Sequence, residues 1–226
     1  MKRVLVSIIL LAACFASEAR KVTGSVKCGE TIMPGITVTD GKTFTQTNRN
    51  GKFSFDIEDN AEFVYIITPA GYCADWSKGS PEFYQKAEGQ DFFSFELTKF
   101  GDPNGKYNII AVGDPQTKTD ANFDEFAEEP LDDICQTVKE LDGLTIGVAL
   151  GDICYDVFPH QLKWKKEIVR TQVPFYPSIG NHDHDQTTFQ ETALGTMHFE
   201  EYLTPTYYTF NIGKVHYVIV NSISFA

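Results

Sequence analysis

Three short polar clusters follow three apolar runs in the second half of the sequence, and each cluster begins with a glycine. Asp114 stands in the first cluster, Asp152 in the second and Asn181 in the third, with Gln116 and His182 within two residues of them. Carboxylate and amide oxygens are the donors that hard divalent cations prefer, and converging carboxylates repel one another unless a cation neutralises them. The clusters therefore predict a divalent-metal site.

The spacing of the clusters carries more weight than any one of them. An Asp-Pro pair such as 114–115 is commonly a turn, and an Asp such as Asp152 commonly caps a helix. The run of Asn, His, Asp, His and Asp over 181–185 is more specific, because so many polar groups need water or a metal. Asp152 follows Asp114 by 38 positions and Asn181 follows Asp152 by 29, about one strand-and-helix unit each.

The elements that would position these clusters form an α/β pattern. Apolar runs at 107–112, 145–150 and 173–179 predict strands, and residues 130–141 and 159–170 predict helices between them. The residues expected to face inward are Leu131, Ile134, Cys135, Val138 and Leu141 in the first helix and Leu162, Ile168 and Val169 in the second. Parallel strands joined by helices bring their carboxyl ends, and hence the three clusters, to one edge of the sheet.

The first half of the sequence has a different period. Residues 20–99 alternate apolar and polar side chains in short runs, with turn dipeptides at 34–35, 40–41 and 50–51. This pattern predicts a small all-β sandwich without a polar group that could do chemistry, serving as a structural or docking module. Residues 100–106 read as a linker.

Residues 1–19 predict a secretory signal peptide, with Lys2 and Arg3 ahead of an apolar run that is too short to span a bilayer. Residues 11–14 also read as a bacterial lipobox, in which Cys14 would carry a lipid anchor. Either alternative predicts an exported protein, periplasmic or extracellular, with no transmembrane span.

An exported chain can form disulfides. Cys28 and Cys73 could pair across the sandwich, whereas Cys135 and Cys154 lie in apolar contexts typical of buried thiols. The formal charge of −12 argues against nonspecific nucleic-acid binding, which needs a basic surface.

The second segment, from about residue 107 to the C-terminus, resembles the calcineurin-like metallophosphoesterases, whose blocks run D-x-H, G-D-x-x and G-N-H-[DE]. The hairpin pattern over 205–220 is common after the third block. The first segment resembles the immunoglobulin-like modules related to the carboxypeptidase regulatory domain, on G-x-V near its start and on the turns at 38–41 and 50–53. The resemblance implies an αββα metallophosphatase-type sandwich, incomplete here, after a small β-sandwich.

The resemblance also implies roles for single residues. Two divalent metal ions (Mn, Fe, Zn or Mg) would be held by Asp114, Gln116, Asp152 and Asn181, with Asp152 bridging both ions. Gln116 departs from the commonest pattern, which has His there, and this leaves the identity of its metal open.

The third block supplies the expected acid. His182 would stabilise the transition state or protonate the leaving oxygen, and Asp156 or Asp183 would orient it. Tyr155 would pack or, as in purple acid phosphatases, bind metal. His184 would lie at the substrate rim, and the remaining histidines, His160, His198 and His216, read as structural or exposed.

The implied activity is hydrolysis of a phosphoester substrate by a dinuclear-metal-bound hydroxide. Family blocks with further histidines, a lone His after Gly and a G-H-x-H, do not occur in this sequence. We therefore expect the N-terminal portion of a phosphoesterase, with poor metal binding and little turnover by itself. The alternative is an exported binding or scaffold protein that carries a degenerate phosphoesterase remnant.

Overall fold

The computed structural model describes residues 19–188 and 192–223, without the side chains of 192–194. Residues 1–18 of the expected signal peptide, Cys14 among them, lie outside the described residues. Within the described ranges, no helix has both the length and the apolar character needed to cross a membrane.

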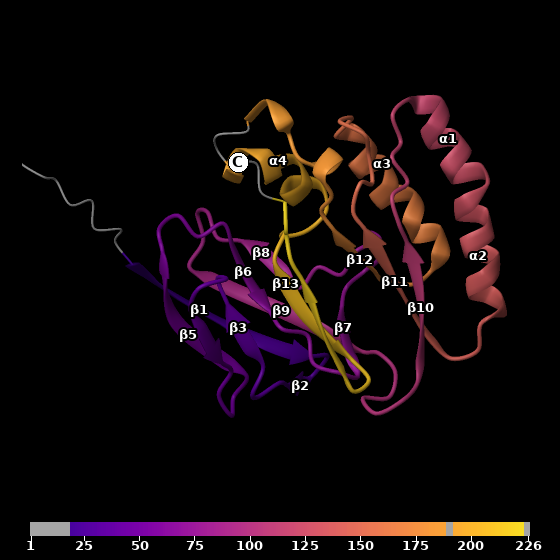
Figure 1. Cartoon of the computed structure of the whole chain (residues 1–226). Coiled ribbons are helices and arrows are strands. Elements are labelled where there is room, and N and C mark those ends of the chain that lie inside the picture. Colours follow the sequence, from indigo (N-terminus) through magenta and orange to yellow (C-terminus); the bar gives the residue numbers. More distant parts are fainter. Residues whose placement is uncertain (1–18, 189–191, 224–226) are drawn as a thin grey trace, which may run out of the picture.

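The first part of the chain is a β-sandwich (Figure 1). One sheet has the order β2-β1-β9-β7, with β5 paired to β1, and the other has the order β4-β3-β6-β8. Alternation in the sequence produces this packing: Phe53, Phe55 and Ile57 point inward from β5 while the residues between them face out. The strands are β1 (Ala19–Cys28), β2 (Thr31–Ile32), β3 (Thr37–Thr39), β4 (Phe44–Gln46), β5 (Lys52–Glu58), β6 (Phe63–Ile66), β7 (Tyr72–Ala74), β8 (Tyr84–Lys86) and β9 (Phe92–Lys99).

The second part begins with a three-stranded parallel sheet of order β10-β11-β12. Its strands are β10 (Tyr107–Val112), β11 (Leu144–Leu150) and β12 (Phe175–Ser178), and its helices are α1 (Asp120–Glu128), α2 (Pro130–Glu140) and α3 (Pro159–Ile168). The predicted parallel strands and the two predicted helices are confirmed. The carboxyl ends of the three strands consequently meet at one edge.

Two details of the helices differ from the sequence expectation. Helix α1 was not predicted, although Thr119 is a sequence signal for its start: the Thr119 side chain accepts a hydrogen bond from the backbone N–H of Asn122. Of the predicted inward residues, Leu162 of α3 and Val169, which begins the following 3-10 turn, are exposed, and Trp164 packs inside with Ile168.

The inward stripe of α3 also includes His160 and Gln161, both buried. Each has a polar partner, since a ring nitrogen of His160 lies 3.0 Å from the carbonyl oxygen of Thr117 and Gln161 Nε2 donates to Asp183. Hydrogen-bonded polar side chains can occupy a buried face, although the Oε1 atom of Gln161 has no partner among the described residues. These two residues take positions that hydropathy alone assigns to apolar side chains.

The chain then continues through short 3-10 turns and α4 into a hairpin, as the sequence predicts for 205–220. These elements are η1 (Val169–Thr171), η2 (Asn181–Asp183), η3 (Gln186–Thr188), α4 (Thr192–Tyr202), β13 (Tyr208–Ile212) and β14 (Val215–Ile219). Strands β13 and β14 pair antiparallel, and the yellow hairpin runs between the sandwich and the parallel sheet in Figure 1.

The hairpin joins the two parts of the molecule into one hydrophobic cluster. Tyr176 of β12 stacks on Phe210 of β13 with ring centroids 3.7 Å apart and an interplanar angle of 6°. Both rings belong to the cluster that fills the sandwich. A second cluster lies between the parallel sheet and its helices. The first of these clusters therefore contains side chains from both sides of the expected linker at 100–106. The described layers are helices, parallel sheet and hairpin, and the outer helix layer of an αββα sandwich is not among them.

The cysteines are free thiols at all four described positions, 28, 73, 135 and 154. Cys28 lies on β1 and Cys73 on β7, with β9 between them. Strands two apart are about 9–10 Å distant, beyond the reach of a disulfide. Cys73 Sγ instead lies 3.5 Å from the Tyr176 hydroxyl, and burial raises the pKa of the thiol to about 12.

Candidate functional site

The three polar clusters meet at the carboxyl edge of the parallel sheet, with Asp152 in the middle. The backbone N–H of Gln116 donates to the Asp152 carbonyl oxygen at 2.8 Å, and the backbone N–H of His182 donates to Asp152 Oδ1 at 3.0 Å. The backbone N–H of Asp156 donates to the His182 carbonyl oxygen at 3.1 Å. The first, second and third clusters are thus joined through hydrogen bonds, as the strand order predicts.

Backbone strain is concentrated in the same loops. Asp114, Gln116, Asp152 and Asp156 have φ values of 60°, 46°, 48° and 59°. Among the described non-glycine residues, only Gln172 also has a positive φ. A left-handed backbone costs a residue with a Cβ about 1 kcal/mol or more, and such strain is typical of functional sites.

Two glycines allow the second and third loops to approach this closely. A Cβ on Gly180 would lie 2.0 Å from Asp152 Oδ1, and Gly151 has φ +87°. Glycine is therefore required at positions 151 and 180, because no side chain fits between the loops there.

The side chain of Gln116 reaches both carboxylates. Its Nε2 donates to Asp114 Oδ1 at 2.7 Å and lies 3.4 Å from Asp152 Oδ2. The positive end of the amide dipole thus stands between two carboxylates, where a cation would be held. Rotating the amide by 180° would present its oxygen instead. The donor set of carboxylate and amide oxygens fits a hard divalent cation such as Mg²⁺ or Mn²⁺.

The fourth expected ligand, Asn181, opens the η2 turn directly after Gly180. Its side chain is exposed and forms no hydrogen bond within the described part of the chain. Across residues 19–188 and 192–223, no three His, Cys, Asp or Glu side chains gather into a metal-holding group. The candidate ligands here are two carboxylates and two amides.

His182 is held by a carboxylate at one ring nitrogen. Its Nδ1 lies 3.1 Å from Asp156 Oδ1, and its side chain is 18% exposed. An ionised carboxylate only accepts hydrogen bonds, so Nδ1 carries the proton and Nε2 is turned toward other partners.

Asp183, the other residue expected to orient His182, faces elsewhere. Its buried carboxylate accepts hydrogen bonds from the backbone N–H groups of Gly180, Ile153 and Cys154, at 3.0, 3.2 and 3.1 Å. Burial raises the pKa of this carboxyl, and the three N–H donors act in the opposite direction. Asp183 ties the second loop to the third.

Two aromatic and cationic groups complete the surroundings of His182. The Tyr155 ring stacks on the imidazole with centroids 3.7 Å apart and an angle of 21°, and Lys118 Nζ lies 4.5 Å from the Tyr155 centroid. Sequence reasoning missed Lys118, because no motif marks a cation that reaches its site through a tyrosine ring. Burial raises the pKa of the neighbouring Cys154 thiol, which keeps it protonated.

The other four described histidines contact residues away from His182. His184 is buried and hydrogen-bonded to Asn221 at 3.4 Å, so it is not at an open rim, and burial lowers its pKa. His198 stacks on Phe158, and His216 pairs with an asparagine of the hairpin. His160 bridges Thr117 and Asp120 and so anchors the first loop to α1.

A hollow of about 590 Å³ adjoins the clusters on the side of α1. Gln116 and Tyr155 form part of its wall, so the hollow borders the first and second clusters. Phe126 and Asn122 of α1 and the exposed Lys118 supply apolar, amide and cationic surface. This volume lies within the about 300–1,000 Å³ range of small-molecule sites.

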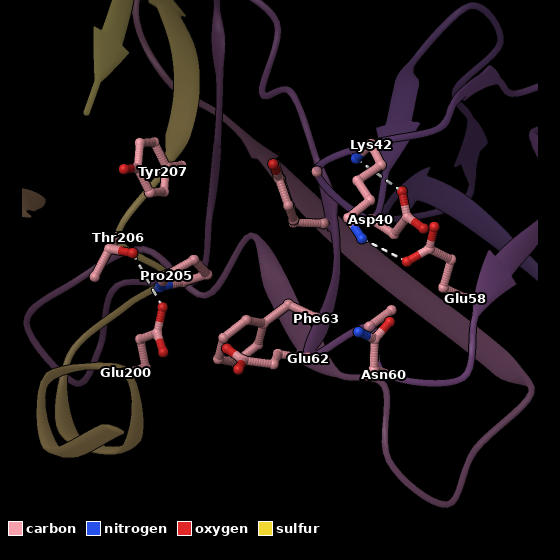
Figure 2. Close-up of a pocket in the computed structure, with 13 residues that line it drawn as sticks. Asp40, Lys42, Glu58, Asn60, Glu62, Phe63, Glu200, Pro205, Thr206 and Tyr207 are labelled. Carbon is pink, nitrogen blue, oxygen red and sulfur yellow. Dashed lines mark hydrogen bonds and ion pairs between the residues drawn. The ribbon is translucent and has the colours of Figure 1, made fainter. Parts of the chain in front are cut away.

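A second hollow, of about 440 Å³, lies where the sandwich meets α4 (Figure 2). Lys42 and Glu58 form an ion pair on its sandwich side. On the other side Thr206 Oγ1 donates to Glu200 Oε1 at 3.1 Å. None of the polar clusters at the strand ends contributes to this hollow.

Comparison with known proteins adds one match. The family model described as the N terminal of calcineurin-like phosphoesterase matches residues 20–100. This range is the β-sandwich, from the second residue of β1 to one residue beyond β9. No curated protein matches the chain. The match supports the calcineurin-like phosphoesterase family and suggests a hydrolase, and it does not extend to the three clusters. The likeness of the sandwich to the carboxypeptidase regulatory module stays a prediction.

Proposed function

We propose that this chain carries the metal-binding edge of an exported, metal-dependent phosphoesterase. The observation that carries the proposal is the convergence of Asp114, Gln116 and Asp152, each with a strained left-handed backbone, beside the His182–Asp156 pair. Oxygen donors and a proton-bearing imidazole at one sheet edge are what hydrolysis of a phosphoester requires.

Asp114, Gln116, Asp152 and Asn181 are the residues that would hold the metal ions. When bound, divalent cations would activate water near neutral pH and offset charge on the phosphoryl oxygens. Two amides among four ligands make the set less anionic than one of carboxylates alone. We therefore expect weak binding and modest turnover by this chain.

His182 would supply the proton for the leaving group. Asp156 holds the proton on Nδ1 and orients the ring, so that Nε2, when it carries a proton, can donate it to the departing alkoxide oxygen. After donation the neutral imidazole remains hydrogen-bonded to Asp156. The alcohol part of the ester would lie in the 590 Å³ hollow behind Gln116 and Tyr155.

The test compares the wild type with Asp152→Asn, an isosteric change that removes the central carboxylate charge. Mn²⁺ binding is measured by titration calorimetry, and hydrolysis of p-nitrophenyl phosphate is measured at millimolar Mn²⁺. Binding and kcat/KM are each expected to fall about tenfold or more. The matched control is Asp124→Asn, which changes an exposed carboxylate of α1.

Equal Mn²⁺ affinity and equal hydrolysis in the wild type and Asp152→Asn would overturn the proposal. The chain would then fall to the alternative, an exported binding or scaffold protein with a degenerate phosphoesterase remnant. A loss that also occurs in Asp124→Asn would count equally against a specific role for Asp152.

A further inference from the structure

Tyr155 lies between two charged or chargeable groups. The His182 imidazole covers one face of its ring at a stacking distance of 3.7 Å, and Lys118 Nζ lies 4.5 Å from the ring centroid. Because the imidazole already occupies one face, the ammonium must approach from the other. The three side chains come from three loops, which follow β10, β11 and β12.

The hydrogen bond from His182 to Asp156 does not prevent the imidazole from rotating about that bond. A single bond at Nδ1 sets the direction of the ring, but the ring can still rock about that bond. The flat contact with Tyr155 opposes this motion, because rocking would separate the two faces. Asp156 and Tyr155 together therefore define where Nε2 points.

We propose that Tyr155 is a positioning residue, which holds the plane of the His182 imidazole so that Nε2 faces the reacting phosphoester. This inference rests on the proposed function. The ring of Tyr155 does the positioning, since its hydroxyl forms no hydrogen bond within the described residues. Lys118 supports the ring from behind through a cation–π contact, and no described carboxylate forms an ion pair with it.

The distinguishing variants are Tyr155→Phe, which keeps the ring and removes the hydroxyl, and Tyr155→Leu, which removes the ring. With an alkyl phosphate such as glycerol 2-phosphate, whose alkoxide leaving group needs a proton, and with Mn²⁺, kcat is expected to fall about tenfold or more in Tyr155→Leu, with KM little changed. Tyr155→Phe is expected to retain the wild-type kcat and the wild-type Mn²⁺ content. If Tyr155 instead bound metal through its oxygen, Tyr155→Phe would lose both.

A spectroscopic readout separates this inference from the proposed function. The ring current of Tyr155 should move the His182 Cε1–H resonance upfield in the wild type and in Tyr155→Phe, and the shift should disappear in Tyr155→Leu. The matched control is Phe158→Leu, which removes the ring stacked on His198, 4.7 Å away. It should move the His198 resonance and leave kcat unchanged.

Either of two results would overturn the inference: Tyr155→Phe as impaired as Tyr155→Leu, or Tyr155→Leu with unchanged kcat and an unchanged His182 resonance. If the wild type does not hydrolyse the ester at all, the proposed function fails. The resonances then judge the positioning role alone: loss of the shift in Tyr155→Leu only supports it, and an unmoved resonance overturns it.

Discussion

Two aspartates near His182 show how surroundings set the role of a residue. Asp156 is 47% exposed and pairs with the imidazole, whereas Asp183 is buried and faces three backbone N–H groups. A carboxylate beside an imidazole controls its tautomer, and a carboxylate enclosed by amide donors holds loops together. The two side chains have the same chemistry, but replacing them is expected to have different effects: loss of stability at Asp183 and loss of activity at Asp156.

Replacing Asp183 with Asn should destabilise the protein. The amide would keep one acceptor oxygen and would turn an NH₂ group toward backbone N–H donors, leaving buried donors unpaired. We expect the free energy of unfolding to fall by about 1–3 kcal/mol, measured by urea denaturation. Asp156→Asn is the comparison: its stability should be nearly unchanged and its kcat lower. Wild-type stability in Asp183→Asn would contradict the structural role.

At the scale of elements, the site depends on how closely the loops after β11 and β12 pack. Gly180 has φ −109°, so its backbone is one that any residue can adopt, and contact alone demands glycine there. Next to Gly180, the Asp183 carboxylate accepts hydrogen bonds from the backbone N–H groups of Ile153 and Cys154, and these bonds hold the two loops together. A methyl group at this contact would force the loops apart.

Gly180→Ala should therefore lower the free energy of unfolding by about 1–3 kcal/mol and weaken Mn²⁺ binding, because the added Cβ would overlap Asp152. Chemical denaturation and titration calorimetry measure the two effects. Gly113→Ala is the matched control, since it also precedes a candidate ligand and a Cβ there meets no atom within 4 Å. If both variants behave alike, loop packing does not control the site.

At the scale of the whole molecule, the sandwich and the α/β part share buried surface. Besides the stack of Tyr176 on Phe210, Glu200 of α4 interacts with Glu62 of the sandwich and accepts a hydrogen bond from Thr196. Glu200 also accepts a hydrogen bond from Thr206 (Figure 2). Burial, followed by the Glu62 charge, raises the pKa of Glu200 to about 7. The junction between the two parts therefore favours the protonated carboxyl.

This raised pKa makes stability depend on pH. The folded state binds the Glu200 proton more tightly than the unfolded chain, whose pKa is near 4.5. The resulting stabilisation is fully present below about pH 4.5 and is lost as the pH rises through about 7. In the wild type, the midpoint temperature of thermal unfolding should fall between pH 5 and 8, because the folded state binds about one more proton than the unfolded chain. Glu200→Gln stays neutral and should flatten this fall.

The control for the pH dependence is Glu201→Gln, an exposed neighbour on the same helix. It should retain the wild-type decline. An identical pH profile in Glu200→Gln and the wild type would show that the junction carboxyl does not titrate in this range.

Local pattern was sufficient for much of the fold. Alternation predicted the sandwich strands, and apolar runs separated by helix periods predicted the parallel strands β10, β11 and β12. The convergence of Asp114, Asp152 and His182 followed, because parallel strands end at one edge. Helix α1 was missed although Thr119 signals its start. The inward stripe of α3 was missed because buried polar residues such as His160 look exposed to any hydropathy pattern.

The sequence by itself determined the elements and the oxygen-rich clusters at their ends, because periodicity and turn residues act within a few positions of one another. Only the tertiary structure decided which aspartate pairs with His182, that Tyr155 stacks on its ring, and that one hydrophobic cluster joins both parts. Those outcomes depend on side chains that are far apart in the chain and meet only after packing, when burial and partners fix the role of each group.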